Sequence, residues 1–117
     1  MEGKKKQIGF TFALNGIKEV MKSERNFRLH IISTLLVIIA GIYFDIETIE
    51  WVAVFTVIGL VITTEILNTA VEEIINYVKP EIHPAAKKIK DMAAGSVLIA
   101  SITALVVGFI IFVPKIF

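Results

Sequence analysis

Three stretches of this chain carry no formally charged side chain, and they constrain its fold more than any other feature. They are residues 29–44, 51–64 and 92–114. A helix needs about 20 mostly apolar residues to cross the ~30 Å hydrocarbon core of a bilayer. The first stretch approaches that length with its flanks, and helical character in the second continues past Glu65 to Val78, before Pro80 and Pro84 break the chain. The predicted transmembrane helices cover about 27–44, 51–78 and 91–113.

Composition agrees with a membrane protein and excludes some chemistry. Hydrophobic residues make up 56% of the chain, and the mean hydropathy is +0.78. Without cysteine, neither a disulfide framework nor a thiolate metal site can form. Residues 8–22 place apolar side chains on one face, with Lys18 and Lys22 where anionic headgroups would lie. We predict an all-α integral membrane protein, with an N-terminal amphipathic surface helix plus three transmembrane helices per protomer, in a single domain over 1–117.

The basic residues lie almost entirely on one side of the predicted spans. Of the 12 lysines and arginines, all but Lys115 fall in residues 1–28 or in the loop over 79–90, whereas the turn at 45–50 is acidic. Basic loops remain in the cytoplasm. We therefore expect a multi-pass protein of the cell membrane with a cytoplasmic N-terminus, a cytoplasmic second loop and an outer C-terminus. The net charge of +1 gives no reason to expect a nucleic-acid partner.

The second predicted span contains polar residues within "VITTEILNTAVEEIINYV". A carboxylate near the middle of a membrane helix costs about 2.5–3.5 kcal/mol on insertion scales. If this run is helical, its polar side chains all fall within one arc of about 100° around the helix axis. They are Glu65, Asn68, Thr69, Glu72 and Asn76. Hydrogen bonds between helices, worth about 0.6 kcal/mol each, would account for Asn68 or Thr69. Such hydrogen bonds do not explain two carboxylates on one face, because like charges buried together repel unless a cation intervenes.

Further charged residues are predicted at the same end of the bundle. Glu24 precedes the first span, and Lys90 and Asp91 lie at the entry to the third. Carboxylate oxygens are ligands for Mg²⁺, and an ammonium group binds phosphate oxygens, so these residues suit a Mg²⁺–phosphate site. Spacing alone does not identify the reaction, since no GxxxxGK[ST] loop, GxGxxG or kinase HRD or DFG motif is present. His30 and His83 are too isolated to indicate zinc, and His30 is expected to be an interfacial residue.

Four segments, "ERNFRLH", "IEW", "EILNTAVE" and "HPAAKKIKDMAAGSVL", resemble the small membrane lipid kinases of prokaryotes, the diacylglycerol kinase and undecaprenol kinase family. The resemblance runs from about Phe10 to the C-terminus. It implies phosphoryl transfer from Mg·ATP to the hydroxyl of a membrane lipid, in a homotrimer of three-span protomers.

The resemblance also implies roles for individual residues. By this resemblance, Glu65 corresponds to the general base of the family, which takes the proton of the lipid hydroxyl. Asn68 corresponds to the polar residue that orients that base or the γ-phosphate. Glu24 and Glu72 correspond to the ligands of Mg²⁺. The residues that correspond to ATP-binding positions are Phe12, Glu24, Glu72, His83, Lys90 and Asp91. Phe12 stands in for a tyrosine of the family.

Two features bear on the lipid acceptor and on the differences from the family. "ERNFRLH", "IEW" and "HPAAK" are more similar to the Gram-positive branch, so undecaprenol ranks first and diacylglycerol is the alternative. Asn76 stands where many members have an aspartate, and we expect this change to alter the charge near the nucleotide more than the chemistry.

Two other classes of protein remain as alternatives. A small ion-coupled membrane carrier could use Glu65 and Glu72, because acids inside a membrane also mark ion pathways. A carrier needs polar access from both sides, whereas the outer half of every predicted span is apolar. A structural scaffold predicts that Glu65→Gln and Glu72→Gln leave any activity unchanged.

Overall fold

The computed structural model describes residues 2–78 and 83–117, with side chains from Gly9 onward. Its helices are α1 (Glu2–Ser23), α2 (Arg25–Tyr43), α3 (Thr48–Val78) and α4 (Pro84–Ile116). α2, α3 and α4 are each long and apolar enough to cross a membrane. The predicted all-α membrane fold with one N-terminal helix and three candidate spans is therefore confirmed.

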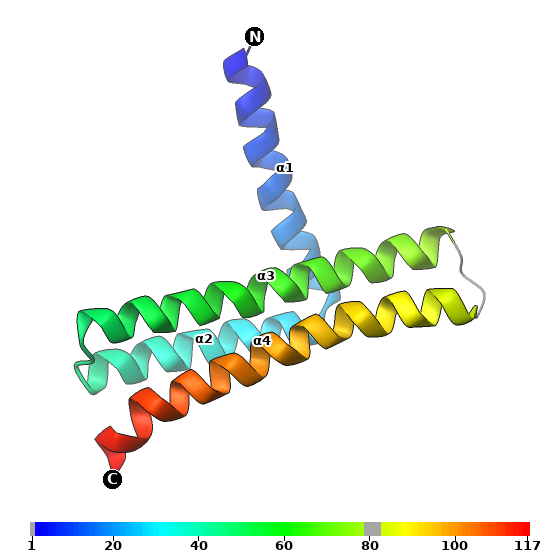
Figure 1. Cartoon of the computed structure of the whole chain (residues 1–117). Coiled ribbons are helices and arrows are strands. Elements are labelled where there is room, and N and C mark those ends of the chain that lie inside the picture. Colours follow the sequence, from blue (N-terminus) through cyan, green and yellow to red (C-terminus); the bar gives the residue numbers. More distant parts are fainter. Residues whose placement is uncertain (1, 79–82) are drawn as a thin grey trace.

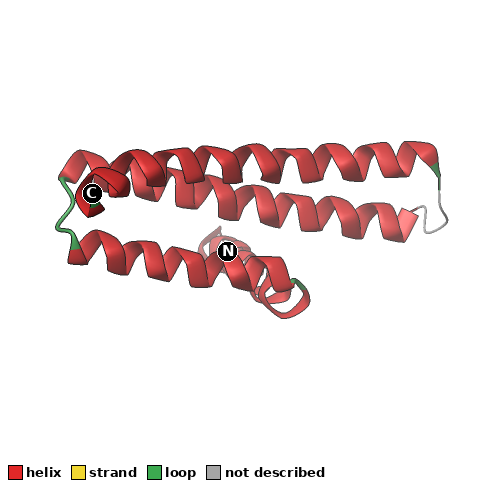
Figure 2. Cartoon of the chain, turned by 90° about the horizontal axis from the view of Figure 1, so that it is seen from below, coloured by secondary structure: helices red, strands yellow, loops and turns green. Residues whose placement is uncertain are grey.

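The three long helices lie side by side, and α1 runs across their common direction (Figures 1 and 2). This is the arrangement expected of a helix that lies along the surface of the membrane that the others cross. α2 has 19 residues, α3 has 31 and α4 has 33. At ~1.5 Å per residue α2 is much shorter than its neighbours, so the end of α3 and the start of α4 extend beyond the point where α1 joins the bundle (Figure 1).

A compact apolar core closes the bundle at the turn between α2 and α3. Ile46, Val54 and Ile111 are buried there, and Trp51 packs against them. Gly41 makes this packing possible, because a Cβ at that position would lie 2.6 Å from the Trp51 ring. Asp45 has a φ of 50°, a left-handed conformation that aspartate tolerates better than most residues.

An ion pair adds to the closure of this end. Glu50 Oε1 lies 3.2 Å from Lys115 Nζ and accepts a hydrogen bond from the backbone N–H of Glu47 at 2.9 Å. The start of α3 is thereby connected to the last turn of α4.

Arginine side-chain bonds fix the junction between α1 and α2. Arg28 Nη1 donates to the carbonyl oxygens of Met21 and Lys22, each at 3.0 Å. These carbonyls belong to the last turn of α1, which has no further helical N–H groups to satisfy them. Val20 and Phe27 are buried on either side of the junction. Arg28 therefore holds α1 at its angle to the bundle.

α4 begins seven residues before position 91, where the sequence predicts the third span to begin, and includes much of the basic loop. His83 caps it, since its Nδ1 accepts from the backbone N–H of Ala85 at 3.1 Å, and Pro84 occupies the first helical position. The predicted break at Pro80 lies outside the described residues.

Candidate active site

The polar stripe of α3, defined as Glu65, Asn68, Thr69, Glu72 and Asn76, passes from the bundle interior to its surface. Glu65 is 3% exposed and Thr69 is 5% exposed. Asn68 and Glu72 are half-buried, and Asn76 is exposed. The Thr69 hydroxyl donates to the Glu65 carbonyl at 3.0 Å. A deeply placed carboxylate is thus followed, turn by turn, by groups that water reaches more easily.

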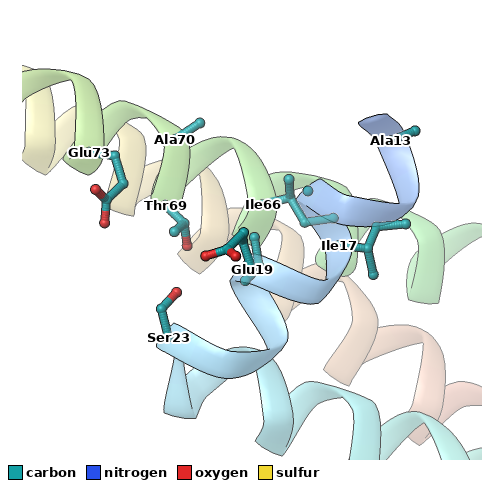
Figure 3. Close-up of a pocket in the computed structure, with 10 residues that line it drawn as sticks. Ala13, Ile17, Glu19, Ser23, Ile66, Thr69, Ala70 and Glu73 are labelled. Atoms are coloured by element: carbon teal, nitrogen blue, oxygen red, sulfur yellow. The ribbon is translucent and has the colours of Figure 1, made fainter. Parts of the chain in front are cut away.

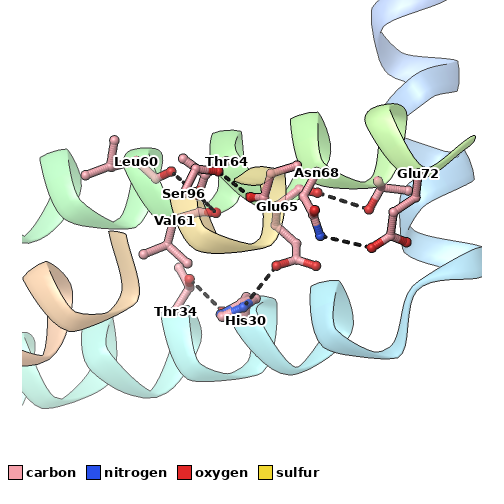
Figure 4. Close-up of polar contacts among 11 residues, drawn as sticks. His30, Thr34, Leu60, Val61, Thr64, Glu65, Asn68, Glu72 and Ser96 are labelled. Atoms are coloured by element: carbon pink, nitrogen blue, oxygen red, sulfur yellow. Dashed lines mark hydrogen bonds and ion pairs between the residues drawn. The ribbon is translucent and has the colours of Figure 1, made fainter. Parts of the chain in front are cut away.

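Glu65 meets a histidine from the neighbouring helix. Its Oε2 lies 3.6 Å from His30 Nε2, across the α2–α3 interface (Figure 4). The sequence-based expectation that His30 is an interfacial residue is therefore incomplete, because His30 also contacts the buried carboxylate. Counting outward from the α2–α3 turn places His30 opposite Val61, one helical turn from Glu65. Both side chains tilt towards the N-terminus of their own helix, which brings them together.

The next turn of the stripe contains an oxygen without a donor. Asn68 Nδ2 donates to Glu72 Oε1 at 3.3 Å (Figure 4). Asn68 Oδ1 is buried and has no hydrogen-bond partner among the described residues. A buried acceptor without a donor is unusual in a folded protein. It leaves this amide oxygen available for a bound ligand.

Glu24 joins the same region from the α1–α2 junction, where it precedes the first residue of α2. Burial raises the pKa of the Glu24 carboxyl above its ordinary value of 4.5. Three carboxylates add to this rise and one guanidinium opposes it; the acids are Glu72, Glu65 and Glu73, and the base is Arg28. Glu24 is therefore repelled by the acids around it. Glu24, Glu65 and Glu72 are hereafter called the carboxylate cluster.

This repulsion predicts a pH-dependent stability. Because the folded state raises the pKa of Glu24, its contribution to stability is present below the ordinary value and is lost as the pH rises through the folded value. We expect Glu24→Gln to melt a few degrees above the wild type at neutral pH in Mg²⁺-free detergent. The difference should disappear below pH 4.5. Thermal unfolding at several pH values measures it, and Glu47→Gln, on the far turn, is the matched control. Equal melting temperatures at neutral pH would contradict the prediction.

The chemistry of these donors fits Mg²⁺. Carboxylate and amide oxygens are its preferred protein ligands, and Mg²⁺ usually takes only one or two carboxylates, with phosphate and water completing the shell. Within residues 2–78 and 83–117, no group of three or more His, Cys, Asp or Glu side chains is placed to hold a metal by itself. Carboxylates such as Glu24 and Glu72, completed by phosphate oxygens and water, would match that pattern.

The other predicted site residues lie apart from the carboxylate cluster. Lys90 Nζ, on α4, donates to Asn76 Oδ1 on α3 at 2.6 Å. Asp91 pairs with Lys87 on its own helix. Phe12 is 67% exposed on α1, and the His83 ring serves as the cap of α4. The structure thus brings Glu24, Glu65, Asn68 and Glu72 together. Lys90 of α4 is bonded to Asn76, which lies one turn beyond Glu72 on α3.

A groove lies beside the stripe, between α1 and α3 (Figure 3). It has a volume of about 580 Å³, and Thr69 of the stripe lines it. Its other polar side chains are Glu19, Ser23 and Glu73. Sequence periodicity did not single out Glu19 or Glu73, because their position in this groove depends on the angle between α1 and α3.

A second groove, hereafter the span groove, follows the membrane-crossing helices. It has a volume of about 510 Å³ and is lined by α2, α3 and α4. Most of its lining is apolar, with Val61 and Phe109 as examples, and His30 also lines it. Because His30 contacts Glu65, an apolar channel along the spans approaches the buried carboxylate.

Comparison with known proteins identifies the family of this chain. The model of the prokaryotic diacylglycerol kinase family matches residues 11–112. The chain is 38% identical to undecaprenol kinase of Bacillus subtilis over 91% of its own length and 86% of that protein. It is 35% identical to a diacylglycerol kinase of Synechocystis, over 92% of this chain and 62% of that protein. It is 30% identical to diacylglycerol kinase of Escherichia coli, over 81% of this chain and 78% of that protein. The chain therefore belongs to the prokaryotic diacylglycerol kinase family, a family of membrane lipid kinases.

Proposed function

We propose that this protein transfers the γ-phosphoryl group of ATP to the hydroxyl of undecaprenol, with diacylglycerol as the alternative acceptor. One observation carries the proposal. The carboxylate of Glu65 is buried at the point where the apolar span groove approaches a cluster of oxygen ligands. A lipid with one hydroxyl on an apolar body and a charged nucleotide could meet there. The identity with undecaprenol kinase over most of both chains supports the acceptor.

In this proposal the reaction depends mainly on positioning. The span groove holds the apolar chain of the lipid so that its hydroxyl lies beside Glu65, which takes the hydroxyl proton as general base. Asn68 orients the reacting groups, and its buried oxygen is free to do so. The burial of Glu65 restricts bulk water, which would otherwise compete with the lipid hydroxyl for the phosphoryl group.

Glu24 and Glu72 would hold Mg²⁺ together with the phosphates of ATP. When bound, the cation reduces repulsion within the carboxylate cluster and neutralises charge on the phosphate oxygens. Lys90 would bind a phosphate oxygen, and the Asn76 amide keeps its ammonium near the end of α3 without neutralising it. Asp91, His83 and Phe12 are the further nucleotide contacts that the family resemblance implies.

We further propose that the N-terminus and the second loop are cytoplasmic and the C-terminus is outside. The distribution of lysine and arginine supports this orientation, and it gives the carboxylate cluster access to cytoplasmic ATP. A homotrimer is the proposed assembly, since three spans offer little surface to enclose both substrates. An ion carrier is disfavoured by the apolar core and the Glu50–Lys115 pair that close the opposite end.

A comparison of acceptors tests the proposal. The purified protein in mixed micelles receives Mg·ATP labelled at the γ-phosphate, with undecaprenol or diacylglycerol at equal mole fraction. We expect a higher kcat/KM for undecaprenol. A preference for diacylglycerol would replace the acceptor and leave the kinase assignment in place. Folded protein that phosphorylates neither lipid would overturn the assignment.

A further inference from the structure

The proposed reaction releases one proton at a buried position. The lipid hydroxyl loses its proton, its oxygen bonds to the γ-phosphorus, and the bond from that phosphorus to the bridging oxygen of ADP breaks. If Glu65 takes the proton, as the proposed function requires, the carboxyl group must lose it again before the next turnover. The Glu65 side chain is only 4% exposed, so direct transfer to bulk water is restricted.

His30 is placed to remove this proton. Its Nε2 lies 3.6 Å from Glu65 Oε2, and its side chain is 28% exposed. Glu65 is therefore the buried partner of the contact, whereas part of the His30 ring lies at the surface of the chain. Catalytic contacts in the free enzyme are often longer than a hydrogen bond, and one water can bridge them. Histidine is also the side chain that most readily gains and loses a proton near neutral pH.

The surroundings leave His30 with few competing partners. On its own helix, Arg28 is engaged with the carbonyl oxygens at the end of α1. On α3, the nearest further acid of the stripe, Glu72, is bonded to Asn68. The side chains by which α4 lines the span groove are Ser101 and apolar residues. Among the described residues, His30 is the basic side chain within 4 Å of the Glu65 carboxylate.

We propose that His30 is the proton relay of this enzyme, carrying the lipid proton from Glu65 to water. The protonated Glu65 carboxyl donates its proton to Nε2 of neutral His30, which regenerates the carboxylate. The resulting imidazolium then releases one proton to water at the exposed edge of the ring. This role rests on the proposed function, and it acts through Glu65 rather than on the substrates.

Kinetics of His30 variants test the relay. His30→Gln keeps a side-chain N–H but cannot accept and release a proton. We expect its kcat to fall by about 100-fold, within the range of general acid–base effects, with the KM values for Mg·ATP and lipid little changed. His30→Ala should lose kcat similarly and recover part of it when imidazole is added to the assay. Imidazole should not restore Glu65→Gln, since that variant lacks the base. Thermal unfolding of each variant in the same detergent verifies the fold.

Three results would contradict the relay. Folded His30→Gln with the kcat of the wild type would show that the proton leaves by another route. A loss that imidazole does not restore in His30→Ala would assign a purely structural role to His30. A wild-type protein that phosphorylates neither lipid would overturn the proposed function and the relay with it, whereas the first two results leave the proposed function intact.

Discussion

Replacing Glu65 by glutamine is expected to reduce phosphoryl transfer by at least about 1000-fold, near the upper range for loss of a general base. The amide has nearly the same size and still fits the α2–α3 interface, but it cannot take up the proton of the lipid hydroxyl. Because positioning of the substrates does not require the charge, the KM for Mg·ATP should change little. Transfer of labelled phosphate to the preferred lipid in mixed micelles measures the effect.

Thr64→Val is the matched control for this change. Thr64 is the preceding residue of α3, and its hydroxyl bonds to the carbonyl oxygens of Leu60 and Val61 in its own helix (Figure 4). Valine keeps the shape, so this variant should retain wild-type activity. If folded Glu65→Gln were as active as Thr64→Val, Glu65 would not be the base, and the scaffold alternative would regain support.

Replacing Glu72 by glutamine is expected to lower activity by about 100-fold at a limiting Mg²⁺ concentration, comparable to loss of one electrostatic group in an active site. Glutamine keeps an oxygen that Asn68 can reach but removes the negative charge that a divalent cation requires. The loss should therefore be smaller at high Mg²⁺. Activity titrated with Mg²⁺ at fixed ATP separates a raised cation requirement from a lower maximal rate.

The adjacent acid provides an internal control. Glu73 is exposed and faces the α1–α3 groove, so Glu73→Gln should keep its activity within about 3-fold and its Mg²⁺ requirement, as expected of a surface substitution. Equal Mg²⁺ curves for the Glu72 and Glu73 variants would mean that net negative charge, rather than a specific ligand, attracts the cation.

The spans themselves could be predicted because a bilayer imposes a simple rule. Backbone polar groups in hydrocarbon must be bonded internally, so an uncharged apolar run of sufficient length becomes a helix. The rule does not predict where α4 begins, because it applies only within the apolar run. Its first turns, from Pro84, are charged and stand beyond the apolar run, and the His83 cap stabilises them in place of lipid.

The candidate site likewise contains one part that local periodicity predicts and another that depends on packing between helices. The order of polar residues on α3 follows from helical periodicity, which is a local property, and so Glu65, Asn68 and Glu72 were predicted to share a face. The contact between His30 and Glu65 required the register of α2 against α3. The bond between Lys90 and Asn76 required the packing of α4 on α3. Neither pairing is visible in the spacing along one helix.

The sequence by itself determined three apolar spans, the basic side of the bundle and the polar face of one helix, because each depends on local periodicity and on the energetics of transfer into lipid. Only the tertiary structure decided which residues meet across helices. The junction of α1 and α2, held by Arg28, places Glu24 near Glu65 and Glu72. The closed turn around Gly41 and Trp51 sets the register that places His30 beside Glu65. Those contacts depend on packing between distant segments, which no local pattern specifies.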